Sequence, residues 1–363
     1  MKKVLVFGMT DNPGGVESVI MNYYRNIDRE CIQFDFLCNS QVVAYESEII
    51  ALGGTIYKIT SRRDSYIEFK KELNEFMKNN AGNYEAIWVN INSLVNIDYL
   101  IMAKKYGIRR RIIHCHNASN DAGVIKGLVH RFNKSRLAKY ATDYWTCSDD
   151  ASPWFFNDEI IQGDKYKVIP NAIDINRFKN NSEVRMNLRT EMGLGYKKVI
   201  GHVGRFHFQK NHKFLIELFE HIVKNDKSYH LLLVGQGELE GEIKELVHNK
   251  NLDENVTFCG VHMDIEKMYQ AMDLFILPSV FEGLGVVALE AQCNGLPCVL
   301  ADCIPHVVKV NDNVEFVDLN SSFEIWQKKI DTLMGKNIDD SNNKMPGSEY
   351  DINVQTKMFE QLL

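Results

Sequence analysis

The most constraining feature of this sequence is a short apolar run that passes into a glycine turn and then into a helical pattern. Leu274–Leu277 has the composition of a strand buried in a parallel sheet. Glu282–Gly285 follows as a turn, and apolar residues at helical spacing extend from Val286 to Asn294. Such a turn lies at the carboxyl edge of the sheet, where the free N–H groups of the helix start favour a phosphate. The segment predicts an α/β fold with an anion-binding turn.

The same alternation of short apolar runs and helical patterns extends over the whole chain. Strands are expected near 3–8, 33–37, 55–57, 86–89, 111–115, 144–147, 199–203, 231–234, 256–258 and 299–301. This rhythm predicts parallel sheets with helices on both faces. A length of 363 residues suits two domains, and the turn around Pro170 marks a connection. We expect an N-terminal domain over 1–170, a second domain over 171–348, and a last helix over 349–363.

The composition is that of a soluble globular protein, with 45% hydrophobic and 25% charged residues. No apolar run approaches the roughly 18 residues of a membrane span. Met1 to Phe7 are interpreted as a strand and not as a signal peptide, because Gly8 interrupts the run. The eight cysteines include no Cys-x-x-Cys pair, so free thiols are expected and a metal site is not. A cytoplasmic protein is the expectation.

Charge is distributed unevenly along the chain. The formal net charge is −6, yet residues 1–173 hold 22 Lys and Arg against 20 Asp and Glu, whereas residues 174–363 hold 20 against 28. Within Lys104–Lys139, ten cations accompany a single acid, Asp121. The N-terminal half is therefore the part that could meet an anionic surface.

Part of Lys104–Lys139 has the pattern of a basic amphipathic helix. The apolar positions are Ile125, Leu128, Val129 and Phe132, with Lys126, Arg131, Lys134, Arg136 and Lys139 around them. Such a helix is typical of contact with an anionic membrane face, and a solvated basic face is the alternative. Nucleic acid is not an expected partner, since the chain is acidic overall and shows no nucleic-acid-binding module.

A second glycine turn follows the first expected strand. Gly14 and Gly15 stand between the run 3–8 and a helical pattern that extends to about Asn26. This order is typical of the start of a doubly wound domain. The spacing differs from the G-x-G-x-x-G fingerprint, so a nicotinamide-dependent oxidoreductase is disfavoured. A plain tight turn accounts for these glycines equally well.

Two cations follow the expected strand 199–203. Arg205 comes directly after it, and Lys210 precedes a helical pattern. Two cations at one strand end can hold a diphosphate and stabilise its charge as it leaves a substrate; surface residues without a function are the alternative. Gly235 and Gly237 form a turn after the next strand, which is a weak signal by itself.

Glu282 and Glu290 are eight positions apart. A glycosidase acid–base pair is disfavoured, because eight residues of helix rise about 12 Å, whereas hydrolytic carboxyl pairs lie roughly 5 to 9.5 Å apart. We interpret them as contacts to two ends of one ligand, a sugar at Glu282 and a hydroxyl pair such as a ribose at Glu290. A capping glutamate and a surface glutamate are the alternative. His114 and His116 point the same way from a strand, but no further cluster completes a zinc site, and structural histidines are the alternative.

The run Glu282–Ala291 resembles the Glu-x7-Glu signature of the retaining GT-B glycosyltransferases of family 4, and Gly283–Pro297 is similar to enzymes that build bacterial capsule and exopolysaccharide repeat units. Gly204–Asn211 resembles the Gly-Arg…Gln-Lys-Asn motif of that family. Asn171–Asp174 resembles its Asn-Gly-Ile-Asp joint, with Ala172 where glycine is usual. The resemblance covers nearly the whole chain. It implies two Rossmann-like domains facing across a cleft, with the last helix crossing back to the first domain.

The resemblance also implies sugar transfer from a nucleotide-diphosphate donor, expected to be a UDP-sugar, with retention of anomeric configuration. The implied catalytic residues are His116, Arg205, Lys210 and Glu282. The implied donor-binding residues are Gly14, Gly15, Arg205, Lys210, Gly235, Gly237, Val261, Glu282, Gly283, Leu284, Gly285 and Glu290. In this scheme His116, followed by Asn117, faces the donor sugar.

The implied acceptor is a lipid-linked glycan or an oligosaccharide in bacterial surface polysaccharide synthesis. No Asp-x-Asp motif is present, so a metal-independent reaction without a cofactor is expected, in which cations and helix dipoles replace a divalent ion. Two alternatives on the same fold stay open: a sugar-nucleotide epimerase, and a non-catalytic partner subunit of a glycosyltransferase pair. The intact charged residues of the motifs count against the partner subunit.

Overall fold

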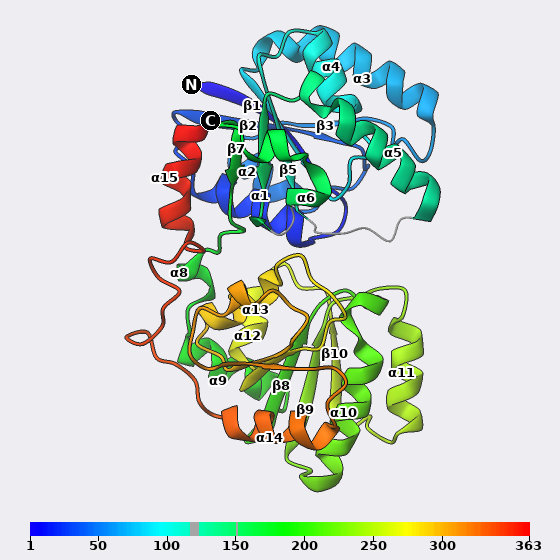
Figure 1. Ribbon diagram of the computed structural model, residues 1–363. Helices are drawn as coiled ribbons and strands as arrows, with labels where there is room; N and C mark the ends of the chain where they lie inside the picture. The colour runs from blue at the N-terminus through cyan, green and yellow to red at the C-terminus, as the bar shows by residue number, and fades with distance from the viewer. Residues whose placement is uncertain (117–122, 150–151) are drawn as a thin grey trace. The chain divides into compact units, whose positions relative to one another are not determined.

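The computed structural model describes residues 1–116, 123–149 and 152–363. These residues form two compact units (Figure 1). Unit 1 comprises Met1–Ala172 together with Ile352–Leu363, and unit 2 comprises Ile173–Asp351. The points of division lie close to the boundaries expected after 170 and after 348. Each unit has its own parallel sheet and its own hydrophobic core.

Unit 1 is built on a seven-stranded sheet with the order β3-β2-β1-β4-β5-β6-β7, in which neighbouring strands are parallel. Its strands are β1 (Lys2–Phe7), β2 (Ile32–Cys38), β3 (Ile56–Lys58), β4 (Ala86–Ile91), β5 (Arg110–Cys115), β6 (Asp143–Thr146) and β7 (Tyr166–Val168). Its helices are α1 (Gly15–Asn26), α2 (Glu46–Ala51), α3 (Tyr66–Asn80), α4 (Asp98–Lys105), α5 (Gly123–Arg136), α6 (Ser152–Phe155), α7 (Asp158–Ile161) and α15 (Ile352–Leu362).

Helices cover both faces of this sheet, which is why its central strands are apolar on both sides. One core includes residues of α3 and α4, and the other includes residues of α1 and α15. In the second core, Phe359 of α15 stacks on Tyr23 of α1 with ring centroids 4.3 Å apart, and it lies 5.0 Å from the ring of Trp88. The C-terminal helix is thus packed into unit 1.

Unit 2 has a six-stranded parallel sheet with the order β10-β9-β8-β11-β12-β13. Its strands are β8 (Lys198–Val203), β9 (Tyr229–Val234), β10 (Val256–Gly260), β11 (Leu274–Leu277), β12 (Cys298–Ala301) and β13 (Val314–Val317). Its helices are α8 (Ile175–Phe178), α9 (Ser182–Glu191), α10 (His212–Asn225), α11 (Glu240–Asn249), α12 (Ile265–Gln270), α13 (Val286–Cys293) and α14 (Phe323–Leu333).

In each unit the strand order reverses at one point, between β1 and β4 in unit 1 and between β8 and β11 in unit 2. Open α/β sheets bind ligands at the carboxyl edge of such a point. In unit 2, β8 leads through the single turn η4 (Phe208–Lys210) into α10, and β11 leads through the glycine turn into α13. The two strongest sequence motifs therefore leave adjacent strands at the same edge.

The expected strands are present, with bounds shifted by one or two residues. The sequence analysis missed β13, an edge strand of four residues, because Glu315 interrupts its apolar run. Helix α14 ends at Leu333. None of the described helices has both the length and the apolar character that a membrane crossing needs.

Candidate active site

Lys210 and Glu282 form an ion pair at the carboxyl edge of the unit 2 sheet. Lys210 ends η4, and Glu282 lies in the turn between β11 and α13. Lys210 Nζ donates to Glu282 Oε1 at 2.6 Å, and the two side chains are 15% and 8% exposed. Two motifs separated by 72 positions therefore meet because β8 and β11 are neighbours.

Two uncharged donors also bind the Glu282 carboxylate. Ser279 Oγ donates to Oε1 at 2.6 Å, and Gln209 Nε2 donates to Oε2 at 3.3 Å. Burying an unpaired carboxylate is strongly unfavourable, and these donors reduce that cost. Ser279 and Gln209 are site residues that the sequence analysis did not identify, since serine and glutamine are common in polar turns.

Glycines allow the loops after β8 and β9 to pack backbone to backbone. A Cβ on Gly235 would lie 2.2 Å from the carbonyl oxygen of Gly204, and a Cβ on Gly237 would lie 2.4 Å from that of Phe206. A Cβ on Gly204 would lie 3.1 Å from carbons of the Lys210 side chain. Gly235 and Gly237, a weak signal in the sequence, thus allow the loop after β9 to pack closely against the loop that leads to Lys210.

Val261 follows β10 at the same edge and is 39% exposed. The preceding carbonyl, that of Gly260, accepts from the backbone N–H of Gly235 at 2.7 Å. The predicted donor-binding positions after β9 and β10 are therefore adjacent.

Arg205 lies after β8 but binds a different carboxylate. Its Nη2 donates to Glu238 Oε2 at 3.0 Å, and His207 Nε2 lies 3.5 Å from the other oxygen. The Arg205 and Glu238 side chains are 61% and 47% exposed, so this pair is worth little to stability. The pKa of Glu238 is lowered mainly because a backbone N–H donates to the carboxylate, with the Arg205 charge adding to the effect. Lys210 and Arg205, the two residues that are predicted to bind the diphosphate, are thus each paired with a different carboxylate.

Glu290 lies in the second turn of α13 and is 6% exposed. Its Oε2 accepts from the hydroxyl of Tyr269, in α12, at 2.7 Å. Burial raises the pKa of Glu290 to about 7, while the Tyr269 hydrogen bond and the more distant Arg177 charge oppose that rise. A carboxyl group that titrates near neutrality in a ligand-binding region is a functional candidate.

The turn between the two glutamates ends in a helix start suited to an anion. Gly285 caps α13 with a φ of 85°, a left-handed conformation that favours glycine. Gly283 is partly exposed, while Leu284 is buried and anchors the turn in the core. The first N–H groups of α13 have no acceptor within the helix, so they can donate to an oxyanion.

Two buried histidines lie near Lys210, and the sequence analysis did not single them out. His202 of β8 donates from Nδ1 to the carbonyl oxygen of Ile276 at 2.9 Å. His212 begins α10 and stacks on Phe206 with ring centroids 4.2 Å apart. Burial lowers the pKa of His202 to about 4 and that of His212 to about 2, and the Lys210 charge adds to both shifts. Both rings are neutral and act as packing groups behind the lysine.

In unit 1, His116 follows β5 at the carboxyl edge of the sheet. Its Nε2–H donates to Asn90 Oδ1, in β4, at 2.8 Å. Burial lowers the pKa of His116 to about 4, so the ring is neutral at physiological pH. The sequence analysis missed Asn90, whose amide N–H in turn donates to the carbonyl oxygen of Phe7. Asn117 lies outside the described residues.

Gly14 and Gly15 open α1 at the same edge of unit 1. A Cβ on Gly14 would lie 2.9 Å from Glu17 Oε2, whereas Gly15 faces open space. Glu17 is buried, accepts from the Thr10 hydroxyl at 2.5 Å, and has a pKa raised by burial. The turn after β1 is therefore stabilised by the hydrogen bond between Thr10 and Glu17, and Gly15 leaves the backbone accessible.

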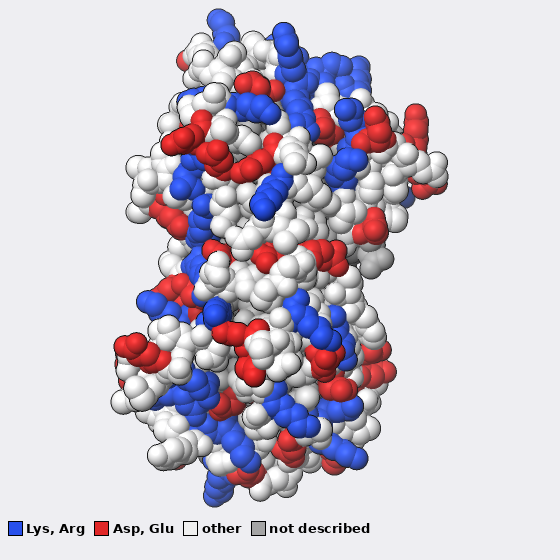
Figure 2. All heavy atoms as spheres, turned by 90° about the vertical axis from the view of Figure 1, so that its left-hand side faces the viewer, with Lys and Arg blue, Asp and Glu red and all other residues white. Residues whose placement is uncertain are grey.

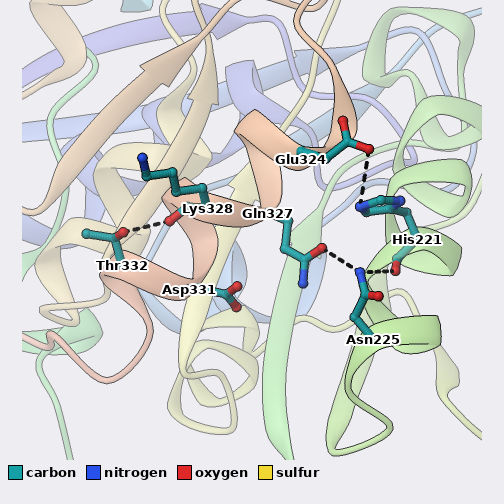
Figure 3. A pocket seen from close by; sticks show the side chains of 7 residues that line it. All are labelled: His221, Asn225, Glu324, Gln327, Lys328, Asp331 and Thr332. Carbon is teal, nitrogen blue, oxygen red and sulfur yellow. Dashed lines mark hydrogen bonds and ion pairs between the residues drawn. The ribbon is translucent and has the colours of Figure 1, made fainter.

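A shallow polar groove of about 610 Å³ lies elsewhere in unit 2 (Figure 3). It runs between the C-terminal half of α10 and α14, where Asn225 Nδ2 donates to Gln327 Oε1 at 3.0 Å. Since α10 is about 21 Å long, this groove is far from the Lys210 end of the helix. No group of three His, Cys, Asp or Glu side chains within the described residues could hold a metal ion.

Two parallel-sheet units, each a Rossmann-like domain, define the GT-B class of glycosyltransferases. Alr3699/HepE of Anabaena, in complex with UDP-glucose, matches with a TM-score of 0.78 at 19% identity over 100% of both chains. WaaG, a glycosyltransferase involved in lipopolysaccharide biosynthesis, matches with a TM-score of 0.68 at 14% identity over 99% of this chain and 95% of WaaG. At these identities the likeness establishes the fold.

Sequence comparison establishes the family. The Glycosyl transferases group 1 family matches residues 187–345. EpsF of Bacillus subtilis, described as a glycosyltransferase without a stated substrate, is 32% identical over 338 residues, which cover 91% of this chain and 87% of EpsF. The UDP-Gal:alpha-D-GlcNAc-diphosphoundecaprenol alpha-1,3-galactosyltransferase of Escherichia coli is 30% identical over 193 residues, 48% of each chain. The chain belongs to the glycosyl transferases group 1 family and is a glycosyltransferase.

Proposed function

We propose that this enzyme transfers a hexose from a UDP-sugar to a lipid-linked glycan in bacterial surface polysaccharide synthesis, with retention of anomeric configuration and without a metal ion. The observation that carries the proposal is the Lys210–Glu282 pair at the carboxyl edge of β8 and β11, beside the free N–H groups of α13. Two relatives support the choice of substrates: HepE was crystallised with UDP-glucose, and the name of the Escherichia coli enzyme states a UDP-galactose donor and a diphosphoundecaprenol-linked acceptor.

In the proposed mechanism Lys210 and Arg205 bind the diphosphate of the donor. Arg205 is well exposed, so it can exchange Glu238 for a phosphate at little cost. The N–H groups at the start of α13 add a preorganised positive potential. As the sugar leaves, negative charge grows on the diphosphate, and these groups stabilise it more strongly than they stabilise the bound donor.

Glu282 and Glu290 are proposed to bind the sugar and the ribose, respectively. Glu290 accepts hydroxyl hydrogen bonds best when ionised, and its pKa is about 7. Nucleotide binding should therefore strengthen as the pH rises through 7, because below that value a proton must first leave. His116 is neutral in unit 1, so its proposed part in transfer is as a hydrogen-bonding group and not as a cation.

The proposed membrane contact uses the outer face of α5. Ile125, Leu128 and Phe132 follow one another at helical spacing and are 79%, 57% and 60% exposed. Lys126, Arg131 and Lys139 beside them are also exposed. Apolar side chains flanked by cations suit a layer of anionic lipid, where insertion and charge attraction act together.

The orientation of α5 is fixed by polar contacts on its inner face. His130 Nδ1 accepts from the Leu94 N–H at 3.2 Å, and Asn133 Nδ2 donates to the Leu94 carbonyl oxygen at 2.6 Å. His130 Nε2–H donates to the Trp154 carbonyl oxygen at 3.0 Å. These bonds bury His130 and Asn133 on the inner face of the helix, while Ile125, Leu128 and Phe132 stay exposed beside the cations. Three exposed large apolar side chains on one helix favour a docking face over an ordinary solvated helix.

Not every cation of Lys104–Lys139 is available to a membrane. Lys134 Nζ donates to the Pro153 carbonyl oxygen at 2.5 Å, and Arg110 binds Asp143 at 2.9 Å. The guanidinium of Arg136 lies 4.9 Å from the centroid of the Tyr140 ring. On another side of the molecule, the side that carries α15, Lys and Arg are interspersed with Asp and Glu (Figure 2). Lys126, Arg131 and Lys139, which are exposed, are thus the better candidates for lipid contact.

The donor proposal is tested with four sugar nucleotides: UDP-glucose, UDP-galactose, UDP-N-acetylglucosamine and UDP-N-acetylgalactosamine. A ligand that binds the folded state raises Tm with the logarithm of its concentration. The best stabiliser is then incubated with undecaprenyl-diphosphate-linked GlcNAc, with and without EDTA. Transfer in EDTA with an α-linked product is expected. Conversion of the donor alone to an isomer would identify an epimerase, and activity that only Mg²⁺ restores would refute the metal-free mechanism.

The membrane proposal is tested by sedimentation with vesicles containing 30 mol% anionic phosphatidylglycerol. Replacing Ile125, Leu128 and Phe132 together by Ser should abolish binding at low salt, while transfer to a water-soluble acceptor analogue continues. Replacing the exposed Met186 of α9 by Ser is the matched control and should leave binding unchanged. If the wild-type protein stays in the supernatant at low salt, the α5 proposal fails.

A further inference from the structure

Glu282 and the diphosphate of the proposed substrate compete for the same cation, Lys210. In the ligand-free chain Lys210 donates to Glu282, whereas in the proposed complex Lys210 donates to the diphosphate. At 8% exposure, water can replace little of the lost interaction. A buried carboxylate deprived of its cation is strongly disfavoured unless other donors hold it.

We infer that Ser279 and Gln209 are positioning residues that hold Glu282 in place while Lys210 engages the donor diphosphate. This inference rests on the proposed contact between Glu282 and the donor sugar. Because both donors are uncharged, the diphosphate has little tendency to attract them away from Glu282. They keep the carboxylate oriented, with lone pairs free for sugar hydroxyls.

The position of Ser279 is set by the fold itself and does not depend on a bound ligand. Ser279 lies just after β11 and is fully buried. Its hydroxyl is directed at Glu282 Oε1 at 2.6 Å, and its carbonyl oxygen accepts from Cys303 Sγ at 3.1 Å. A hydrogen bond from a buried, immobile donor loses little entropy when the substrate binds.

Gln209 joins the two loops of the site through three hydrogen bonds. Its carbonyl oxygen accepts from the N–H of Val280 at 2.8 Å. Its side-chain Nε2 donates both to the carbonyl oxygen of Phe281 at 3.0 Å and to Glu282 Oε2 at 3.3 Å. The turn that carries Lys210 and the turn that carries Glu282 are therefore held in register by the residue next to the lysine.

The test separates the sugar from the nucleotide. Affinities for UDP and for the best-stabilising UDP-sugar are measured by titration calorimetry on full-length Ser279→Ala and Gln209→Ala. Loss of one hydrogen bond to a carboxylate should weaken the UDP-sugar about tenfold, and should change the affinity for UDP less than twofold. Gln209→Ala should show the smaller selective loss, because its bond is longer. Thr257 of β10 carries a hydroxyl that is bound to His230 of β9, so Thr257→Val is the control and should change neither affinity.

A double-mutant cycle shows whether Ser279 acts through Glu282. Adding Ser279→Ala to Glu282→Ala should cause no further loss of UDP-sugar affinity. A further tenfold loss, or equal losses for UDP and UDP-sugar in both single variants, would overturn the inference. If Glu282→Ala itself shows no selective loss for the UDP-sugar, the proposed sugar contact fails. If Glu282→Ala shows that loss but neither positioning variant does, only the present inference fails. Should Ser279→Ala not fold, Gln209→Ala decides.

Discussion

Replacing Glu290 by Gln should stabilise the ligand-free enzyme at alkaline pH and weaken nucleotide binding at the same time. Glu290 is 6% exposed, and burial raises its pKa to about 7, from 4.5 for a free side chain. Folding therefore favours the protonated acid. The contribution of Glu290 to stability is complete below about pH 4.5 and is lost as the pH rises through about 7.

The size of the effect follows from that shift. A rise of the pKa from 4.5 to about 7 corresponds to about 3 kcal/mol of unfolding free energy. Glutamine resembles the protonated acid, can accept from Tyr269, and does not ionise. The free energy of unfolding of Glu290→Gln minus that of the wild type should thus be small and constant below about pH 4, and it should begin to rise near 4.5, the pKa of a free side chain. It should rise to about 3 kcal/mol by pH 8.5, which is about 6 °C or more in Tm for a domain of this size.

Urea unfolding of the two ligand-free proteins at pH 5, 6, 7, 8 and 8.5 measures this difference. Other titrating groups, such as the buried histidines, are common to both proteins and cancel. Tyr269→Phe is a second test, because its hydroxyl stabilises the ionised carboxylate; without it, the loss of stability should move to higher pH. A difference between Glu290→Gln and the wild type that is flat from pH 5 to pH 8.5 would refute the burial argument.

Three further outcomes are expected. Lys210→Ala and Arg205→Ala should each lower kcat/KM roughly 100-fold in steady-state transfer assays; near wild-type transfer by Lys210→Ala would contradict its role. Lys210→Ala should also lower Tm more than Arg205→Ala, since it leaves the buried Glu282 without its cation whereas Arg205 is exposed; equal Tm values would argue against that burial. Gly235→Ala should cost about 1–3 kcal/mol in urea unfolding and lower activity, because its Cβ would lie 2.2 Å from the Gly204 carbonyl oxygen at a φ of 133°; an unchanged unfolding midpoint would argue against that close approach.

The sequence predicted the fold because parallel α/β units repeat one local pattern. Each apolar run is followed by a turn and a helical stretch, and chain connectivity with the right-handed crossover rule leaves few other arrangements. The turn from Glu282 to Gly285 was found with the helix start at the correct residue, since glycine and the return of helical spacing are local signals. Edge strand β13 was missed because an edge strand needs no long apolar run.

The pairings inside the site could not be predicted in the same way. Lys210 and Glu282 were each identified, but their contact depends on β8 and β11 being neighbours. Tyr269 and Asn90 were missed because neither stands in a motif, and each becomes relevant only through the packing of another element against Glu290 or His116. Tertiary contacts, and not local preference, select such partners.

Helix α5 illustrates a different limit. Its apolar spacing was visible in the sequence, yet spacing alone does not say which face turns inward. An ordinary surface helix buries its apolar side. Here His130 and Asn133 are buried and bind backbone groups of Leu94, while Leu128 and Phe132 stay exposed. Only the positions of the buried backbone groups decide between the two orientations.

The environments of Glu282 and Glu290 make their proposed roles separable by pH. Glu282 is held by a lysine, a serine and a glutamine, whereas Glu290 is buried against one tyrosine and titrates near pH 7. The ribose belongs to UDP and to UDP-sugar alike, so protonating Glu290 should weaken both ligands by the same factor between pH 8 and pH 6. The terminal phosphate of UDP itself titrates at about pH 6, whereas a UDP-sugar has no such group. The ratio of the two affinities should therefore depend on pH in the same way in the wild type and in Glu290→Gln, while substitution of Glu282 changes that ratio at every pH. A pH dependence of the ratio that differed between the wild type and Glu290→Gln would place Glu290 at the sugar and reverse the two assignments.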